Sequence, residues 1–269
     1  MKKLVSSPYL LWMVVFIIVP LFFVAYSAFT NDAQEFTIGN FSSIMKYTPV
    51  FLKSLWLAVV STVICLLIAY PLAFVLSRKS PRSQGMLVML IMLPMWINFL
   101  LRTYAWMTLL ENEGLINKFL ELLGFGSVQM INTQGAVVLG MVYNYLPFMV
   151  LPLYSIMCKI EPSVLEAAQD LGAGRFQTIF RVILPLSKTG ILTGIIMVFV
   201  PSVSTFAISR MLGGGSNMLI GDLIEEQFLG GAYNPNVGSA LSLILMVVIL
   251  IIIGVTNTFD SDEMEGMLV

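Results

Sequence analysis

The chain has 269 residues, of which 58% are hydrophobic and 11% are charged. Soluble domains carry about 25% charged and about 45–50% apolar residues, so this composition excludes a soluble globular enzyme and a disordered chain. The 14 Lys and Arg residues oppose 15 Asp and Glu residues, which leaves no basic field for a nucleic-acid partner. There is no His and there are two Cys, too few for a disulfide framework and without metal-ligand spacing. We therefore expect no metal site.

Long uncharged stretches predict six membrane-spanning helices, because a helix needs about 20 apolar residues to cross roughly 30 Å of hydrocarbon. The expected spans are residues 9–29, 54–77, 86–110, 135–157, 188–208 and 238–257. Each run is continuous rather than alternating with a period of two, which excludes a β-barrel. The first run also suits a signal peptide, but it is much longer than the 7–15 apolar residues typical of one. The sequence thus predicts an all-α, polytopic membrane protein.

Lys and Arg are distributed unevenly between the connecting segments, which predicts the orientation. If the N-terminus is cytoplasmic, nine bases lie inside: Lys2, Lys3, Arg78, Lys79, Arg82, Lys159, Arg175, Arg181 and Lys188. Four lie outside: Lys46, Lys53, Lys118 and Arg210. We therefore expect both termini inside, residues 31–53 and 210–237 outside, and residues 159–187 inside.

The chain is expected to have three parts. Residues 1–53 form the first span and an external loop, residues 54–257 form a compact core of five spans, and residues 258–269 form a short acidic cytoplasmic tail.

The segment between the fourth and fifth spans has the pattern of a short amphipathic helix. Ser163-x-x-Glu166 is spaced as a capping box at its start. Gly172 and Gly174 are expected to end it, since glycine tolerates the left-handed conformation of a helix cap. Its small residues, Ala167 and Ala168, would let another backbone approach closely. The pattern alone leaves two interpretations open: a helix that docks in a groove of a partner, and a helix that lies on the lipid headgroups.

Glu166-Ala-Ala, three residues, Gly172, nine residues and Val182-x-Leu184-Pro185 resemble the EAA loop of ABC importer permeases. The one departure is Val182, where that motif has Ile. Residues 102–106, 145–148 and 211–221 also resemble the permeases of spermidine/putrescine importers, and of their two permeases the B-type subunit. The resemblance covers about residues 8–257.

The resemblance implies half of a type I ABC importer, with residues 54–257 as its permease core, in the plasma membrane of a bacterium. The expected partners are a second permease in a heterodimer, two copies of a cytoplasmic ATPase, an extracytoplasmic polyamine-binding protein and membrane lipid. The chain has no G-x4-G-K-[ST] phosphate loop, so we expect no enzyme activity and no cofactor of its own, ATP being bound by the partner subunit. By resemblance, the ATPase-coupling residues are Glu166, Ala167, Ala168, Asp170, Leu171, Gly172 and Ala173.

Polar and aromatic residues in or near the spans are candidates for the substrate path or a gate. They are Trp96, Asn98, Arg102, Tyr143, Asn144, Tyr145, Phe206, Ser209 and Asp222. Tyrosine faces attract ammonium groups, and Arg102 is expected to act as a gate or to pair with Glu111 or Glu113. The alternatives are ordinary aromatic packing and, for Arg102, snorkelling to the interface.

Two further classes of function are weighed against an ABC permease. A stand-alone secondary transporter would need intramembrane carboxylates or His for ion coupling, and the six expected spans contain none. A membrane enzyme would need a nucleophile–base or metal constellation, and the sequence presents none. A permease of the same class for another solute stays open. The external segments carry eight acids against four bases, which favours a polycation through electrostatic steering, although the depletion of outer bases follows from orientation alone.

Overall fold

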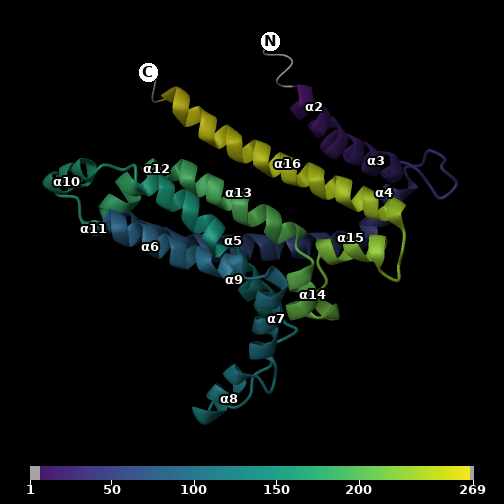
Figure 1. The fold of residues 1–269 in the computed structure, drawn as a ribbon, viewed down its shortest axis with the longest axis horizontal. Coiled ribbons are helices and arrows are strands. Elements are labelled where there is room, and N and C mark those ends of the chain that lie inside the picture. The colour runs from purple at the N-terminus through teal and green to yellow at the C-terminus, as the bar shows by residue number, and fades with distance from the viewer. Residues whose placement is uncertain (1–6, 267–269) are drawn as a thin grey trace.

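A computed structural model describes residues 7–266 as a bundle of helices (Figure 1). The cytoplasmic placement predicted for residues 1–6 and 267–269 concerns residues outside the part of the chain that the structure describes. Four helices within it are long and apolar enough to cross a membrane: Pro8–Ala28, Gly39–Ser77, Gln134–Met157 and Pro235–Thr256. The number rises to six if each of two sharply bent helix pairs is one span. The expected all-α membrane fold is confirmed.

The N-terminal span consists of α2 (Ser7–Met13), a π-helical turn (Val14–Ile18) and α3 (Val19–Ala28). The wide turn precedes Pro20, whose ring would clash with the carbonyl of residue 16 in a regular α-helix. No residue in the apolar window of this span is buried, so it offers an apolar surface of the kind that faces lipid. It packs along the C-terminal helix α16 (Pro235–Gly266), which runs without a break beyond residue 257 (Figure 1).

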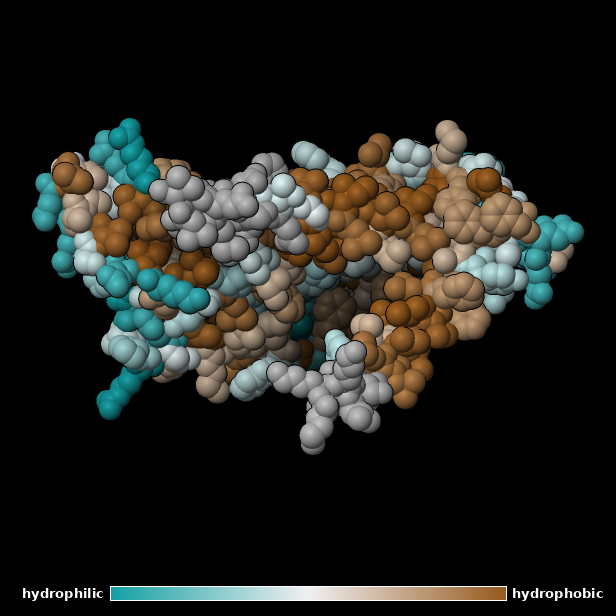
Figure 2. Space-filling model, turned by 90° about the horizontal axis from the view of Figure 1, so that it is seen from above, coloured by the Kyte–Doolittle hydropathy of each residue, from teal (hydrophilic) through white to brown (hydrophobic). Residues whose placement is uncertain are grey.

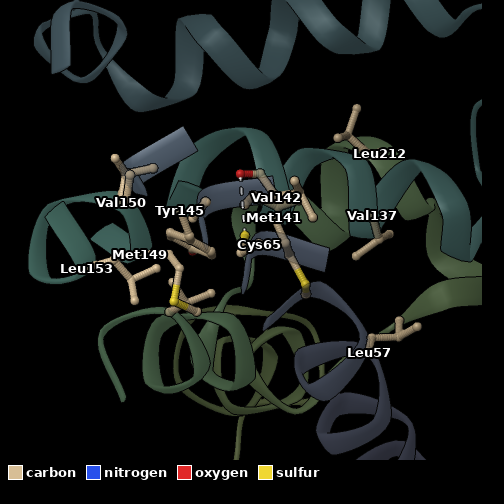
Figure 3. Close-up of a cluster of buried hydrophobic side chains, with 14 of the residues drawn as sticks. Leu57, Cys65, Val137, Met141, Val142, Tyr145, Met149, Val150, Leu153 and Leu212 are labelled. Carbon is tan, nitrogen blue, oxygen red and sulfur yellow. Dashed lines mark hydrogen bonds between the residues drawn. The ribbon is translucent and has the colours of Figure 1, made fainter. Parts of the chain in front are cut away.

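A short loop closed by a bridge between Thr30 and Phe36 leads to α4 (Gly39–Ile44), a 3-10 turn (Met45–Tyr47) and α5 (Thr48–Ser77). Helix α5 forms the centre of the bundle with α9 (Gln134–Met157) and α13 (Lys188–Ser204). Figure 3 shows buried side chains of α5 and α9 gathered in one cluster, with Cys65 of α5 donating to the carbonyl of Val142 on α9. Gly194 lets α13 approach closely, because a Cβ there would lie 2.5 Å from the sulfur of Met149.

The third expected span is broken. Helix α6 (Pro81–Met92) and a 3-10 turn (Leu93–Trp96) end at an extended Ile97, and α7 (Phe99–Leu110) starts after it; the two arms meet at 86°. Pro94 lacks an amide hydrogen, and the Asn98 side chain caps α7 by accepting the N–H of Leu100 at 2.8 Å. The span expected over 86–110 therefore corresponds to a bent helix pair, a break that the sequence did not predict.

The fifth expected span also departs from the prediction. Helix α13 ends at Ser204, extended Thr205 follows, and α14 (Ala207–Gly213) starts a new segment, so the straight helix stops short of residue 208. At its other end, Ser187 separates α13 from the preceding segment at a 70° bend, two residues after Pro185. That segment consists of α11 (Arg175–Thr178), a π-helical turn (Ile179–Ile183) and α12 (Leu184–Leu186).

The remaining helices lie near the two ends of the bundle. Helix α10 (Pro162–Asp170) protrudes at one end; α15 (Ile220–Leu229), preceded by a 3-10 turn (Gly215–Asn217), lies toward the other, and α8 (Leu115–Leu122) extends away from α7 (Figure 1). Figure 2 shows hydrophobic side chains across the middle of one face and hydrophilic ones at its two ends. This is the distribution of a protein whose middle lies in hydrocarbon and whose ends meet water.

Candidate coupling helix and polar clusters

Helix α10 starts two residues earlier than the sequence suggested. Its N-cap is Glu161, Pro162 is its first residue, and no side chain caps it. The Ser163 hydroxyl donates to the Glu161 carboxylate at 3.1 Å instead. Proline is well suited to the first helical position, because its missing N–H would have no partner there. The expected capping box between Ser163 and Glu166 is therefore wrong.

The end of α10 is a glycine cap of the Schellman type. Gly172 has φ +79°, its N–H donates to the Gln169 carbonyl at 2.8 Å, and the Ala173 N–H donates to the Ala168 carbonyl at 3.0 Å. The expected left-handed residue is thus Gly172. Gly174 has a different role: it is the N-cap of α11, where its N–H donates to the Gln177 side chain at 3.1 Å.

The coupling residues expected on α10 fall into two groups. Five are exposed: Glu166, Ala167, Asp170, Leu171 and Gly172. Leu171 is 89% exposed. Ala168 is 9% exposed and Ala173 is half-buried, so these two face their own chain. Ala167 and Ala168 therefore do not share one small-residue surface, as the sequence suggested.

The base of this helix is attached to α5. The Arg78 guanidinium, which lies 5.5 Å from the Phe74 ring, donates to the Ile160 carbonyl at 3.1 Å. A cavity of about 570 Å³ separates α10 from α11 and from Phe74. Helix α10 is thus anchored near its start by this contact, and a cavity lies between it and the neighbouring elements.

The candidate path residues do not form a single site. Arg102 is buried, with Nε and Nη1 lacking hydrogen-bond partners, and within the described residues it makes no ion pair with Glu111 or Glu113. The expected pairing is therefore wrong: Arg102 is on the covered side of α7. Tyr145 donates to the Pro201 carbonyl at 3.3 Å. Helices α7 and α14, which follow the two breaks, pack against each other.

Other candidates have separate structural contacts. Tyr143 packs edge-to-face on Trp106, with ring centres 5.4 Å apart. Asn144 donates to the Gly140 carbonyl at 2.9 Å, while its own carbonyl oxygen is buried without a partner. Trp96 is 71% exposed.

At the α15 end, Phe206 is exposed, and the buried Ser209 donates to its carbonyl at 2.9 Å. Asp222 is buried, and one carboxylate oxygen accepts the Leu219 N–H at 2.8 Å. Burial raises the pKa of the Asp222 carboxyl, against the opposing effects of the Ser209 hydroxyl, the Leu219 N–H and the Arg210 charge. Ser209, Arg210 and Asp222 therefore form one polar cluster at this end.

Sequence reasoning missed a polar network that holds the glycine-rich segment after α14. Asn217 donates to the Asn132 carbonyl at 2.8 Å and to the Gly213 carbonyl at 3.0 Å. Lys53 donates to the Asn217 side chain at 2.8 Å. A Cβ on Gly214 would lie 2.6 Å from the Asn132 side chain. The sequence marks these residues only as loop-type, since they come from three distant segments.

Residues 37–256 match the family described as binding-protein-dependent transport system inner membrane component. The chain belongs to this family. The expectation of an ABC importer permease is confirmed: the chain is a multi-pass permease of this inner-membrane family, and the family's members are transport subunits.

Curated relatives match most of the permease. This chain is 39% identical over 252 residues to the spermidine/putrescine transport system permease protein PotB of Haemophilus influenzae. The aligned region covers 90% of this chain and 88% of that protein. The chain is 37% identical to PotB of Escherichia coli (88% and 90%) and 30% identical to the inner membrane ABC transporter permease protein YdcU of that organism (84% and 77%).

The fold has a solved counterpart. A chain of a bacterial ABC transporter that imports the acidic polysaccharide alginate superimposes with a TM-score of 0.82 at 18% identity, covering 97% of this permease and 95% of that chain. A second structure of an alginate ABC transporter, in complex with a periplasmic protein bound to an alginate pentasaccharide, gives 0.81. At this identity the likeness concerns the fold alone.

Proposed function

We propose that this permease imports polyamines, spermidine or putrescine, as the membrane subunit of an ATP-driven transporter. The observation that carries the proposal is the 37–39% identity to spermidine/putrescine permeases over nearly the whole chain. The permease performs no catalysis. It alternates between two access states, and a partner that prefers one state shifts their populations.

The proposed assembly is a heterodimer with a second permease, on two copies of a cytoplasmic ATPase that bind the ATP. A binding protein delivers substrate outside. Helix α10 and both termini face the cytoplasm, in agreement with the nine-to-four distribution of bases. The exposed Leu171 and Ala167 support a role of α10 as the helix that docks into the ATPase, because a short amphipathic helix can place its apolar residues in a groove of a partner.

The proposed path passes the region where the two broken spans meet. Non-helical backbone at membrane depth is tolerated only where it is buried in protein or lines a water-filled cavity. The breaks at Ile97 and Thr205 meet that condition if they lie on the path or against the second permease, and so do the buried Arg102 and Tyr145.

The test is uptake by the complete complex in proteoliposomes, with ATP inside and loaded binding protein outside. We expect import of radiolabelled spermidine or putrescine, and faster ATP hydrolysis when the binding protein is loaded. If neither polyamine is imported while an anion or a sugar is, the substrate assignment fails, whereas membership of the importer class stands.

A further inference from the structure

A small cavity of about 70 Å³ lies between the end of α14 and the start of α15. Its lining is Arg210, Gly214, Gly215, Met218 and Asp222, and we call it the Asp222 cavity. A Cβ on Gly215 would meet no atom within 4 Å, so this part of the wall is open. About 10–15 Å³ of such space is enough to hold one water molecule, so the cavity has room for one small charged group.

One carboxylate oxygen in this cavity lacks a partner. Asp222 is 4% exposed; its Oδ2 accepts the Leu219 N–H, and its Oδ1 is buried with no hydrogen bond. Buried polar atoms are nearly always hydrogen-bonded, and an uncompensated buried charge is costly. Capping of α15 therefore accounts for half of this carboxylate and leaves the other half free.

The nearest base is already occupied. Arg210 donates to both carboxylate oxygens of Glu225, through Nη1 and Nη2. Arg210 is thus engaged with Glu225 and forms no hydrogen bond with Asp222 Oδ1. Lys53, which is at the same end of the molecule, donates to Asn217 and to the Ser216 carbonyl instead.

We infer that the Asp222 cavity binds a single primary ammonium group, the end group of a cationic substrate. The assignment rests on the proposed function, because it takes the polyamine as the source of the ammonium. A primary ammonium has three N–H donors, and the Oδ1 of Asp222, which has no hydrogen bond, is an acceptor of the matching kind. The cavity is at the α15 end, where substrate leaves the binding protein, so it acts as the first contact of the substrate with the permease.

Two variants test this site in different ways. Asp222→Asn removes the charge but keeps an oxygen for the Leu219 N–H, so the cap of α15 survives. Gly215→Leu keeps the carboxylate and the cap but fills the open wall. The matched controls are Glu226→Gln, which removes one charge from the same helix, and Gly231→Leu, which adds the same side chain where a Cβ also meets no atom within 4 Å.

The measurement is spermidine imported per ATP hydrolysed, by the complete complex at saturating loaded binding protein. Each cavity variant should lower this ratio by roughly tenfold, the worth of one hydrogen bond to a charged group, while both controls keep the wild-type ratio. If the Asp222→Asn permease does not assemble into the complex, the transport ratio of the Gly215→Leu variant tests the site. Wild-type ratios in the assembled cavity variants, or equal losses in the controls, would overturn the site alone; a wild-type complex that imports neither polyamine would overturn the proposed function and the site with it.

A further arm separates the substrate's ammonium from an alkali metal ion. Replacing external Na⁺ and K⁺ by tetramethylammonium, which is too bulky for the cavity, should leave the wild-type ratio unchanged. A fall in the ratio would mean that the cavity takes a metal ion, and the ammonium assignment would be wrong.

Discussion

The two ends of this permease are built differently. At the α15 end, Asn132, Asn217 and Lys53 bind each other across three segments, and Gly214 fits against Asn132 with no room for a side chain. At the α10 end, a nine-residue helix ends in a glycine cap, carries an exposed leucine and stands over a cavity of about 570 Å³. The glycine-rich segment at the first end is thus held by contacts within the chain. Helix α10 at the second end has few such contacts and leaves apolar surface exposed.

Disrupting the exposed face of α10 should give the largest effect. Ala167→Trp adds bulk to an exposed position and touches no span, so insertion should be normal while ATPase co-purification, stimulated ATP hydrolysis and uptake are abolished. Gly172→Asp should act in the same way, since the left-handed backbone costs only about 1 kcal/mol. The assays are co-purification and turnover in proteoliposomes, with Gly231→Trp as a bulky control. Normal turnover in both variants would make α10 a lipid-surface helix.

Ala168→Trp sharpens the same comparison, because Ala168 faces its own chain. Overpacking costs about 1–3 kcal/mol, so this variant should lose both coupling and thermal stability of the detergent-extracted permease. Ala167→Trp should lose coupling alone. Equal stability losses in the two variants would contradict the orientation of α10.

Gly214→Ala tests the α15 end. Its backbone, at φ +60° and ψ −178°, belongs to a region that only glycine populates, so a Cβ should cost about 1–3 kcal/mol. The clash with Asn132 adds to this. The midpoint of thermal unfolding should fall, whereas Gly215→Ala, in open space, should stay within about 0.5 kcal/mol of the wild type. Equal midpoints for the two would mean that this segment is not held as described.

Helix caps should give the smallest effects, and they differ from the expectation of the sequence. Asn98→Ala removes the observed cap of α7 and should cost about 0.5–2 kcal/mol. Ser163→Ala should cost almost nothing, because Ser163 caps no helix. Thermal unfolding of the two single variants measures the difference. A larger loss of stability for Ser163→Ala than for Asn98→Ala would mean that Ser163 does cap α10.

Hydrophobicity and local motifs were enough to predict much of the fold. Uncharged runs located the apolar segments, and the spacing of Gly172 after an amphipathic pattern located the left-handed cap. The helix breaks at Ile97 and Thr205 were not predicted, because a run of apolar residues has the same pattern whether the helix continues or turns. The burial of Arg102 and the partners of Asn217 were not predicted either, since both depend on contacts between distant segments that no local pattern encodes. Polar residues were therefore recognised as candidates, but not their grouping.

The most direct test of the central claim, that α10 is the cytoplasmic seat of the ATPase, is the accessibility of one thiol. Cysteine replaces Ala167 in a permease from which Cys65 and Cys158 have been removed, and an impermeant thiol reagent is applied to sealed vesicles of each orientation. The account predicts labelling only in inside-out vesicles, and loss of that labelling when the ATPase is bound. Labelling from the outside, or labelling that bound ATPase does not reduce, would contradict it.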